Sequence, residues 1–137
     1  MTDAEFVRAF EIRQLKDAHF GHRDHLRMAW WYLQDRSLKD AVARTQEAIR
    51  SFARDHAHIY RYHATLTELW VRLIAAHRDG HPFSTFGDFI DANGELLDKK
   101  LPLRFYSAGL LYSDDARSRW VAPDVRSLPD LCRTDAR

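Results

Sequence analysis

The residues of this sequence that could do chemistry are histidines at helical spacing. His22 and His25 lie three positions apart, directly before the apolar stretch Met28 to Leu33, and His63 precedes a second apolar stretch. Imidazole is the commonest metal ligand in proteins and titrates near neutral pH. Residues at i and i+3 share one helix face, so the first two rings can converge, and His63 can reach the same point from a neighbouring helix. Three protein ligands with an open fourth position are typical of a catalytic metal centre.

The sequence therefore predicts one divalent transition metal held by His22, His25 and His63. Imidazole ligands suit zinc, iron, copper and nickel alike, so the identity of the metal stays open. The competing interpretation is that each ring hydrogen-bonds to the backbone or packs on a tryptophan. His19, in the connection before the first pair, and His56, at the end of an apolar stripe, could also join the site.

Four other residues are candidates for work beside the metal. Glu11 is the best-placed carboxylate, as a fourth ligand, as acceptor of a ligand's second N–H, or as a general base. Arg104 can clamp a substrate carboxylate bidentately, and Tyr106 beside it can donate a proton or a hydrogen bond. Thr67 can hydrogen-bond the substrate or the backbone. The alternative for Arg104 and Tyr106 is an arginine that extends along the surface and a tyrosine that packs.

The elements that must position these residues are helices. Thr2 and Glu5 form a capping box at the first one, and apolar residues then recur at a period near 3.6. We expect four main helices, which run from Thr2 to about Lys16, from about His22 to Asp35, from Ser37 to about Ala57, and from near Tyr60 past His77. A short helical cap follows at the C-terminal end. The predicted fold is all-α in a single domain of residues 1–137, with 121–137 a mostly irregular tail.

Composition limits the classes of function. The chain has 137 residues, 45% of them hydrophobic, and a formal net charge of +1 without a basic cluster, so a nucleic-acid partner is disfavoured. The single cysteine, Cys132, excludes an intrachain disulfide and a cysteine-based zinc site. The longest apolar run is too short to span a bilayer. The first residues show no signal peptide, so we expect a cytoplasmic location and no membrane partner.

The motif Phe20-x-His22-x-x-His25-Leu26-x-x-Ala29-Trp30, followed by Tyr62-His63-x-Thr65-x-Thr67, resembles a family of small stand-alone bacterial helical proteins. The likeness extends through Asn93 to Leu97, Tyr106-Ser107 and Pro123-Asp124, so it covers most of the chain. It implies that the two histidine motifs are a signature, and it implies no reaction. The chain lacks the paired Glu-x-x-His motifs of di-iron bundles, and the His-Asp sequence of helical phosphohydrolases occurs only as His22-Arg23-Asp24.

Two functions are open from the sequence. The first is a small mononuclear metalloenzyme acting on a small, anionic substrate, with hydrolase, lyase and oxygenase chemistry unresolved. The second is a non-catalytic helical module that binds a partner or a small ligand. Trp31 falls on the face opposite the core stripe of its predicted helix, which indicates a further contact surface and a possible homodimer.

Overall fold

The computed structural model describes residues 1–15 and 20–129. The described residues form helices and 3₁₀ turns without a strand, as the all-α prediction required. In chain order the elements are α1 (Asp3–Glu11), α2 (His22–Leu33), α3 (Leu38–Asp55), η2 (Ile59–Arg61), α4 (Ala64–Arg78), α5 (Phe86–Ala92), η3 (Gly94–Leu97), η4 (Leu101–Arg104), α6 (Ala108–Leu111) and α7 (Asp114–Ser118).

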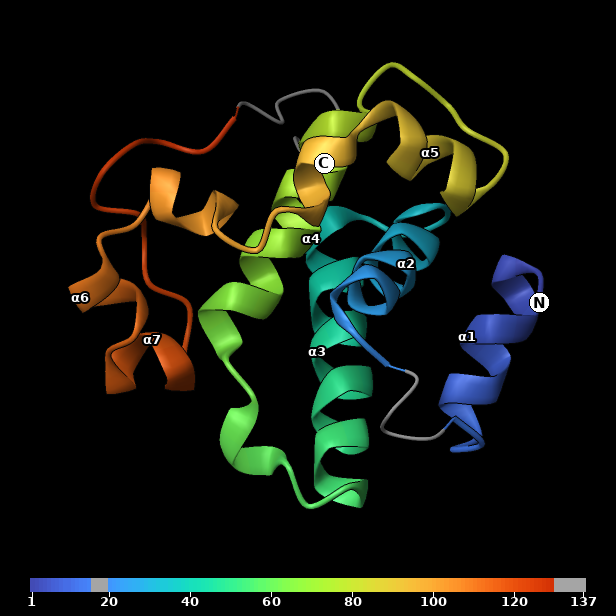
Figure 1. The fold of residues 1–137 in the computed structure, drawn as a ribbon, viewed down its shortest axis with the longest axis horizontal. Coiled ribbons are helices and arrows are strands. Elements are labelled where there is room, and N and C mark those ends of the chain that lie inside the picture. Colours follow the sequence, from blue (N-terminus) through green and yellow to red (C-terminus); the bar gives the residue numbers. More distant parts are fainter. Residues whose placement is uncertain (16–19, 130–137) are drawn as a thin grey trace.

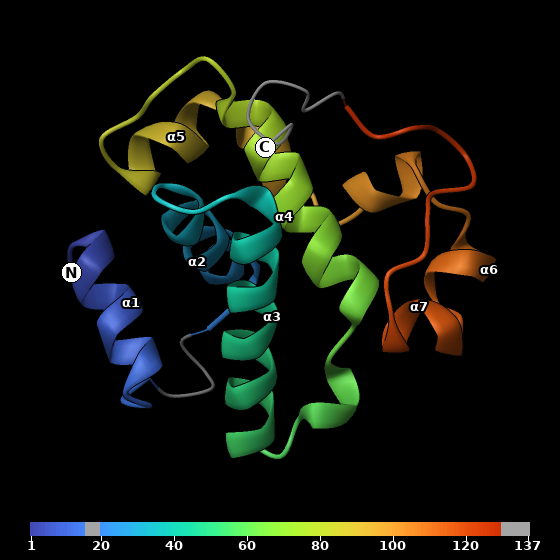
Figure 2. The same cartoon turned by 180° about the vertical axis from the view of Figure 1, so that it is seen from behind.

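Helices α2, α3 and α4 pack on one another and form the centre of the molecule (Figure 1). Helix α1 lies against α2 at one side, and α5 lies near the end of α4 (Figure 2). The short elements α6 and α7 pack on the opposite side, where α7 contacts α4. The two histidine motifs begin α2 and α4, so the central three helices decide what those rings can reach.

Local sequence explains where most helices begin. The capping box of Thr2 and Glu5 is present, and Ser37 accepts a hydrogen bond from the backbone N–H of Asp40 at the start of α3. The expected apolar stripe of α3 is buried at Ala41, Val42, Thr45 and Phe52. These contacts are local or periodic, which is why the pattern was sufficient to predict them.

Two predicted boundaries were wrong. Helix α1 ends at Glu11 rather than near Lys16, because Arg13 takes a left-handed backbone conformation with φ of 65° that ends the helix; Lys16 itself is outside the described residues. The fourth long helix does not begin near Tyr60. A 3₁₀ turn comes first, and α4 starts only after His63, which is its N-cap.

The C-terminal cap is held by side chains and by the first part of the predicted tail. Tyr106 donates from its hydroxyl to the carbonyl of Val121 at 2.6 Å, and the carboxylate of Asp124 accepts from both the backbone N–H and the hydroxyl of Ser107. Residues 121–129 are irregular, as expected, but those near Asp124 are bonded to the cap rather than trailing.

No helix in the described ranges is both long and apolar enough to cross a membrane.

Candidate functional site

His22 opens α2 with its ring turned toward the C-terminal half of the chain. Its Nε2–H donates to the backbone carbonyl of Leu96 at 2.9 Å, and the ring lies 4.5 Å from that of Trp70, edge-on. Burial lowers the pKa of His22, against the opposing effect of the Leu96 carbonyl. The ring is therefore neutral near pH 7, with Nδ1 as its unprotonated nitrogen.

His63 uses both of its ring nitrogens within the fold. The backbone N–H of Leu66 donates to Nδ1 at 3.0 Å, which makes the imidazole the N-cap of α4. The proton is thus on Nε2, which donates to the carbonyl of Leu111 at 2.6 Å. Burial lowers the pKa of His63, and the nearby Arg117 lowers it further. This histidine joins α4 to α6.

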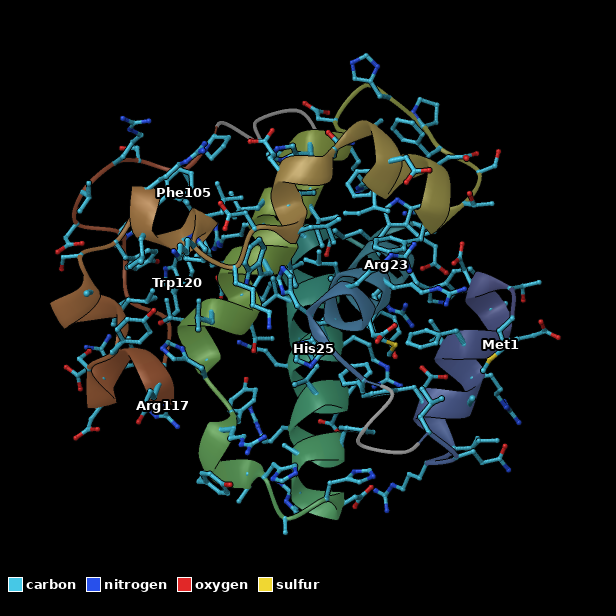
Figure 3. The ribbon with its side chains drawn as sticks, viewed as in Figure 1. Met1, Arg23, His25, Phe105, Arg117 and Trp120 are labelled. Atoms are coloured by element: carbon cyan, nitrogen blue, oxygen red, sulfur yellow. The ribbon has the colours of Figure 1, made fainter. Side chains whose placement is uncertain are left out.

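His25 differs from both. It lies where α2 passes α3 (Figure 3), and its ring packs 4.4 Å from that of Phe20. Within the described part of the chain the ring makes no hydrogen bond. Burial lowers the pKa of His25 to about 4, and the neighbouring His22 and Lys99 add to the shift. His25 is therefore a neutral imidazole whose hydrogen-bonding capacity the described residues leave unused.

His25 lines a hollow with two lobes between α2, α3, η2 and the start of α4, which we call the His25 pocket. One lobe, the Trp70 lobe, has a volume of about 160 Å³, and the adjoining Phe52 lobe has about 150 Å³. Both lobes are lined by His25, Ile49, Arg61 and Tyr62. The Trp70 lobe adds Ala29, Thr45, His63, Leu66, Thr67 and Trp70, and the Phe52 lobe adds Phe20, Phe52, Ala53 and His58.

Two hydroxyl groups at this pocket lack hydrogen bonds. Oγ1 of Thr45 and the hydroxyl oxygen of Tyr62 are buried, and neither has a partner among the described residues. Thr45 is 1% exposed and sits in the middle of α3. Buried polar groups are hydrogen-bonded in the great majority of cases, and each exception calls for an explanation. Here both exceptions lie on one hollow, beside the unbonded ring of His25.

The predicted metal site is brought together only in part. His25 and His63 line the same lobe, and His22 is close enough for its charge to act on His25. His63, however, has no nitrogen left for a metal unless it gives up its cap or its bond to Leu111. Over residues 1–15 and 20–129, no three histidine, cysteine or acidic side chains are grouped so as to hold a metal ion. The three-histidine centre stays a prediction that this geometry does not favour.

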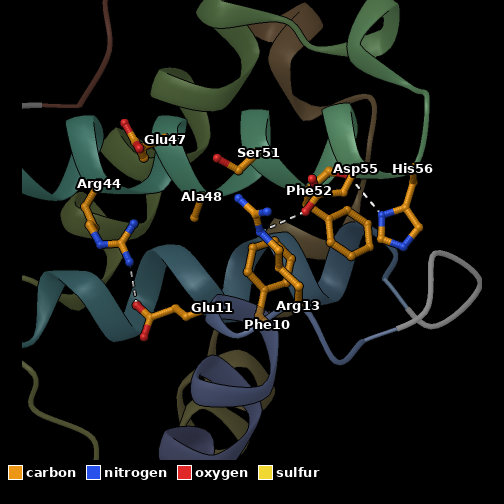
Figure 4. Close-up of a pocket in the computed structure, with 10 residues that line it drawn as sticks. All are labelled: Phe10, Glu11, Arg13, Arg44, Glu47, Ala48, Ser51, Phe52, Asp55 and His56. Carbon is orange, nitrogen blue, oxygen red and sulfur yellow. Dashed lines mark hydrogen bonds and ion pairs between the residues drawn. The ribbon is translucent and has the colours of Figure 1, made fainter.

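Glu11 lines neither lobe of the His25 pocket. Its Oε2 accepts from the hydroxyl of Tyr32 and from Arg44, both at 2.7 Å. Burial raises the pKa of Tyr32, and the bond to Glu11 raises it further. Glu11 and Arg44 face each other across a hollow of about 540 Å³ between α1 and α3, where Arg13 also pairs with Asp55 (Figure 4). We call this hollow the charged cleft; its lining includes Glu11 and not His25.

The other predicted residues divide between packing and the pocket. Tyr106 is fully buried with its hydroxyl bonded to Val121, and burial raises its pKa to about 12, which agrees with the packing alternative of the prediction. Arg104 is exposed and does not line the His25 pocket. Thr67 does line the Trp70 lobe, but its hydroxyl donates to the carbonyl of His63, the backbone alternative of the prediction.

The remaining histidines lie at various places. His56 bonds to the carbonyl of Phe52 and borders the charged cleft, and His77 bonds to the carbonyl of Leu73 and to Glu95. His58 lines the Phe52 lobe. The prediction for His19 lies outside the described residues.

Trp31, expected to face a partner, is partly buried and packs against the core beside α1 and α5, so the homodimer stays a prediction.

Sequence reasoning missed Thr45, Tyr62 and Arg61. The spacing places Thr45 in the apolar stripe of α3, where a threonine hydroxyl ordinarily donates to the backbone carbonyl one turn back. Tyr62 was noted only as the residue before His63. One signal was available: Arg61-Tyr62-His63 places three polar side chains side by side at a helix start.

No family model, curated protein or solved structure matches this chain. The resemblance drawn from the histidine motifs therefore stays a prediction, and the function has to be argued from the site.

Proposed function

We propose that this chain binds a small organic molecule in the His25 pocket, with neutral His25 in contact with it. One observation carries the proposal: Thr45 and Tyr62 line the same hollow, and their buried hydroxyls lack partners in the described part of the chain. A buried, unsatisfied hydroxyl costs about 1–3 kcal/mol. A bound polar group that pairs with both would recover that cost, so the fold favours an occupant with hydrogen-bonding atoms.

Binding is better supported than catalysis. A general base works best when its pKa lies near the operating pH, whereas burial holds the pKa of His25 at about 4. At neutral pH this ring is a good hydrogen-bond donor and acceptor but a weak base. Glu11, Tyr106 and Arg104 lie elsewhere or are otherwise bonded, so no second acid–base group of the predicted set stands beside it. This favours the ligand-binding alternative of the sequence interpretation.

Titration with phenol, a neutral ring with one hydroxyl, tests the proposal. In two-dimensional NMR spectra we expect phenol to shift the backbone signals of Thr45, Ile49 and Tyr62 and the ring signals of His25. Ile49→Trp should fill the junction of the lobes and abolish these shifts. Ala43→Trp, exposed on the same helix, is the matched control and should leave them intact. Absence of shifts at these residues up to ~10 mM phenol would overturn the proposal.

A metal-dependent enzyme is the second candidate. It is supported by two neighbouring rings with unused nitrogens, because His22 has a free Nδ1 and the ring of His25 makes no hydrogen bond within the described part of the chain. Elemental analysis of protein purified without an affinity tag tests it. About one equivalent of metal, lost in His25→Gln, would favour this candidate, and metal-free protein that still binds phenol would favour the first.

A further inference from the structure

The polar groups around the His25 pocket share one property, which is that each can donate a hydrogen bond. The hydroxyls of Thr45 and Tyr62 donate, neutral His25 has one ring N–H, and the guanidinium of Arg61 has five N–H groups. Among residues 1–15 and 20–129, no aspartate or glutamate lines either lobe. The group that best complements a set of donors is one that only accepts, and an ionised carboxylate is such a group.

The charge around the pocket points the same way. Arg61 lines both lobes and makes no ion pair within the ranges that the structure describes. The guanidinium of Arg50 lies 5.1 Å from the centre of the Tyr62 ring, and Arg117 donates to the carbonyl of Tyr60 in η2. Three arginines, Arg50, Arg61 and Arg117, therefore lie at or beside residues 60–62 at the edge of the pocket. Their charge favours an anion over a cation or a neutral molecule.

The size of the pocket limits the rest of the molecule. Each lobe, at about 160 and 150 Å³, is close to the roughly 150 Å³ engineered cavity that binds benzene. The Phe52 lobe is the more aromatic one, because the rings of Phe20 and Phe52 line it; Ala53 adds an apolar contact. Their rings lie 4.7 Å apart at an angle of 46°. A single aromatic ring fits this lobe in both volume and character.

We propose that the ligand is a small aromatic carboxylate, with its ring in the Phe52 lobe and its carboxylate at Arg61, Tyr62 and Thr45. This inference rests on the proposed function and names the class of molecule that the pocket takes. Arg61 and Tyr62 line both lobes, so they stand at the junction where ring and carboxylate meet. The anion site predicted at Arg104 is replaced by one at Arg61.

Benzoate and benzamide, which share a ring and differ in charge, form the test. By NMR titration or calorimetry we expect benzoate to bind the wild-type chain about tenfold more tightly than benzamide, the size of one charge-assisted hydrogen bond. Arg61→Gln should weaken benzoate binding far more than benzamide binding and so remove this preference. Arg104→Gln is the matched control, an exposed arginine away from the pocket, and should keep the preference intact. Arg61→Lys should retain part of it, because the charge stays and the bidentate geometry goes.

The outcomes separate this inference from the proposed function. Equal affinities for benzoate and benzamide, or a preference that survives Arg61→Gln, would overturn the aromatic carboxylate while phenol binding still supported a ligand pocket. A preference lost in Arg104→Gln instead would return the anion site to Arg104. Failure of phenol, benzamide and benzoate together would overturn the pocket's binding function itself.

Discussion

The charged cleft and the His25 pocket lie on two sides of α3. The cleft is the larger hollow and its charged side chains form ion pairs, whereas the pocket is smaller and is lined by polar residues that lack partners among the described residues. The charged cleft is the larger, at about 540 Å³, yet Glu11, Arg44, Arg13 and Asp55 pair with one another across it. The lobes of the His25 pocket are less than a third of that volume each. It is the smaller hollow that is lined by Thr45 and Tyr62, whose buried hydroxyls have no partner among the described residues.

The difference shows which property indicates a binding site here. The ion pairs of the charged cleft join α1 to α3, and Tyr32 on α2 adds a hydrogen bond to the same carboxylate. The charged groups of the cleft therefore pair within the fold. At the His25 pocket, hydrogen-bonding groups lack a partner among the described residues, and a ligand could bond to them. If this distinction is correct, substitutions should cost stability in the paired region and binding in the unpaired one.

The largest effect should come from His63, the one ring at the pocket whose two nitrogens are both bonded. His63→Ala removes the N-cap of α4 and leaves the carbonyl of Leu111 without its donor. Caps contribute about 0.5–2 kcal/mol and a buried unsatisfied group costs about 1–3 kcal/mol. We expect a loss of about 3 kcal/mol in the free energy of unfolding, measured by denaturant titration. His63→Asn, which keeps a capping side chain, should recover part of it. A loss below about 1 kcal/mol would show that this histidine is as free as His25.

Acid should destabilise the protein through the unbonded ring. The pKa of His25 is lowered from 6.5 to about 4, so the unfolded chain binds its proton more readily than the folded one. The stability that this neutral ring contributes is complete above pH 6.5 and is lost as the pH falls toward 4. Between pH 7 and 4.5 a shift of this size removes on the order of 2–3 kcal/mol. Chemical denaturation at pH 7 and 4.5 measures it, with His25→Gln as the reference. An equal pH dependence in the variant would contradict the shift.

A smaller loss is expected in the charged cleft. Glu11→Gln keeps an acceptor for Tyr32 but removes the charge that pairs with Arg44. The side chains of Glu11 and Arg44 are 31% and 34% exposed, so solvent weakens the pair, and we expect a loss of about 1 kcal/mol. A thermal melt of Glu11→Gln, Arg44→Gln and the double variant measures the coupling. A coupling near zero would mean that the cleft is no more paired than the pocket.

The sequence was sufficient for the fold because its signals are local. The capping box at Thr2, the cap at Ser37 and the stripe of α3 depend on residues within a few positions of one another. The spacing also predicts that His22 and His25 share a helix face, because residues three positions apart on a helix lie on the same side. What it could not give was the partner of each ring, since Leu111 is 48 residues from His63 and Leu96 is 74 residues from His22.

The same limit applies to the other candidate site residues. Glu11 and Tyr106 are predicted as acid–base groups from residue type and position, but their partners come from other helices and from the tail, which a periodic pattern does not reveal. The sequence does not indicate Thr45 and Tyr62 either, because it cannot show whether their hydroxyls have a partner in the fold. A hydroxyl is ordinary in a sequence, and it becomes informative only when the packing around it provides no acceptor.

The smallest change in stability, and the sharpest contrast with Glu11, should come from Thr45→Val. Valine matches threonine in shape and removes a hydroxyl that has no partner among the described residues, so the free energy of unfolding should stay within about 0.5 kcal/mol or rise. Benzoate binding should nevertheless weaken severalfold, because the ligand loses one donor. Thr65→Val is the matched control: that hydroxyl donates to the carbonyl of Arg119 at 2.7 Å and accepts from Val121, so its loss should cost about 1–3 kcal/mol. If Thr45→Val costs as much as Thr65→Val, the hydroxyl of Thr45 is bonded in solution, and the pocket has no unused capacity there to offer a ligand.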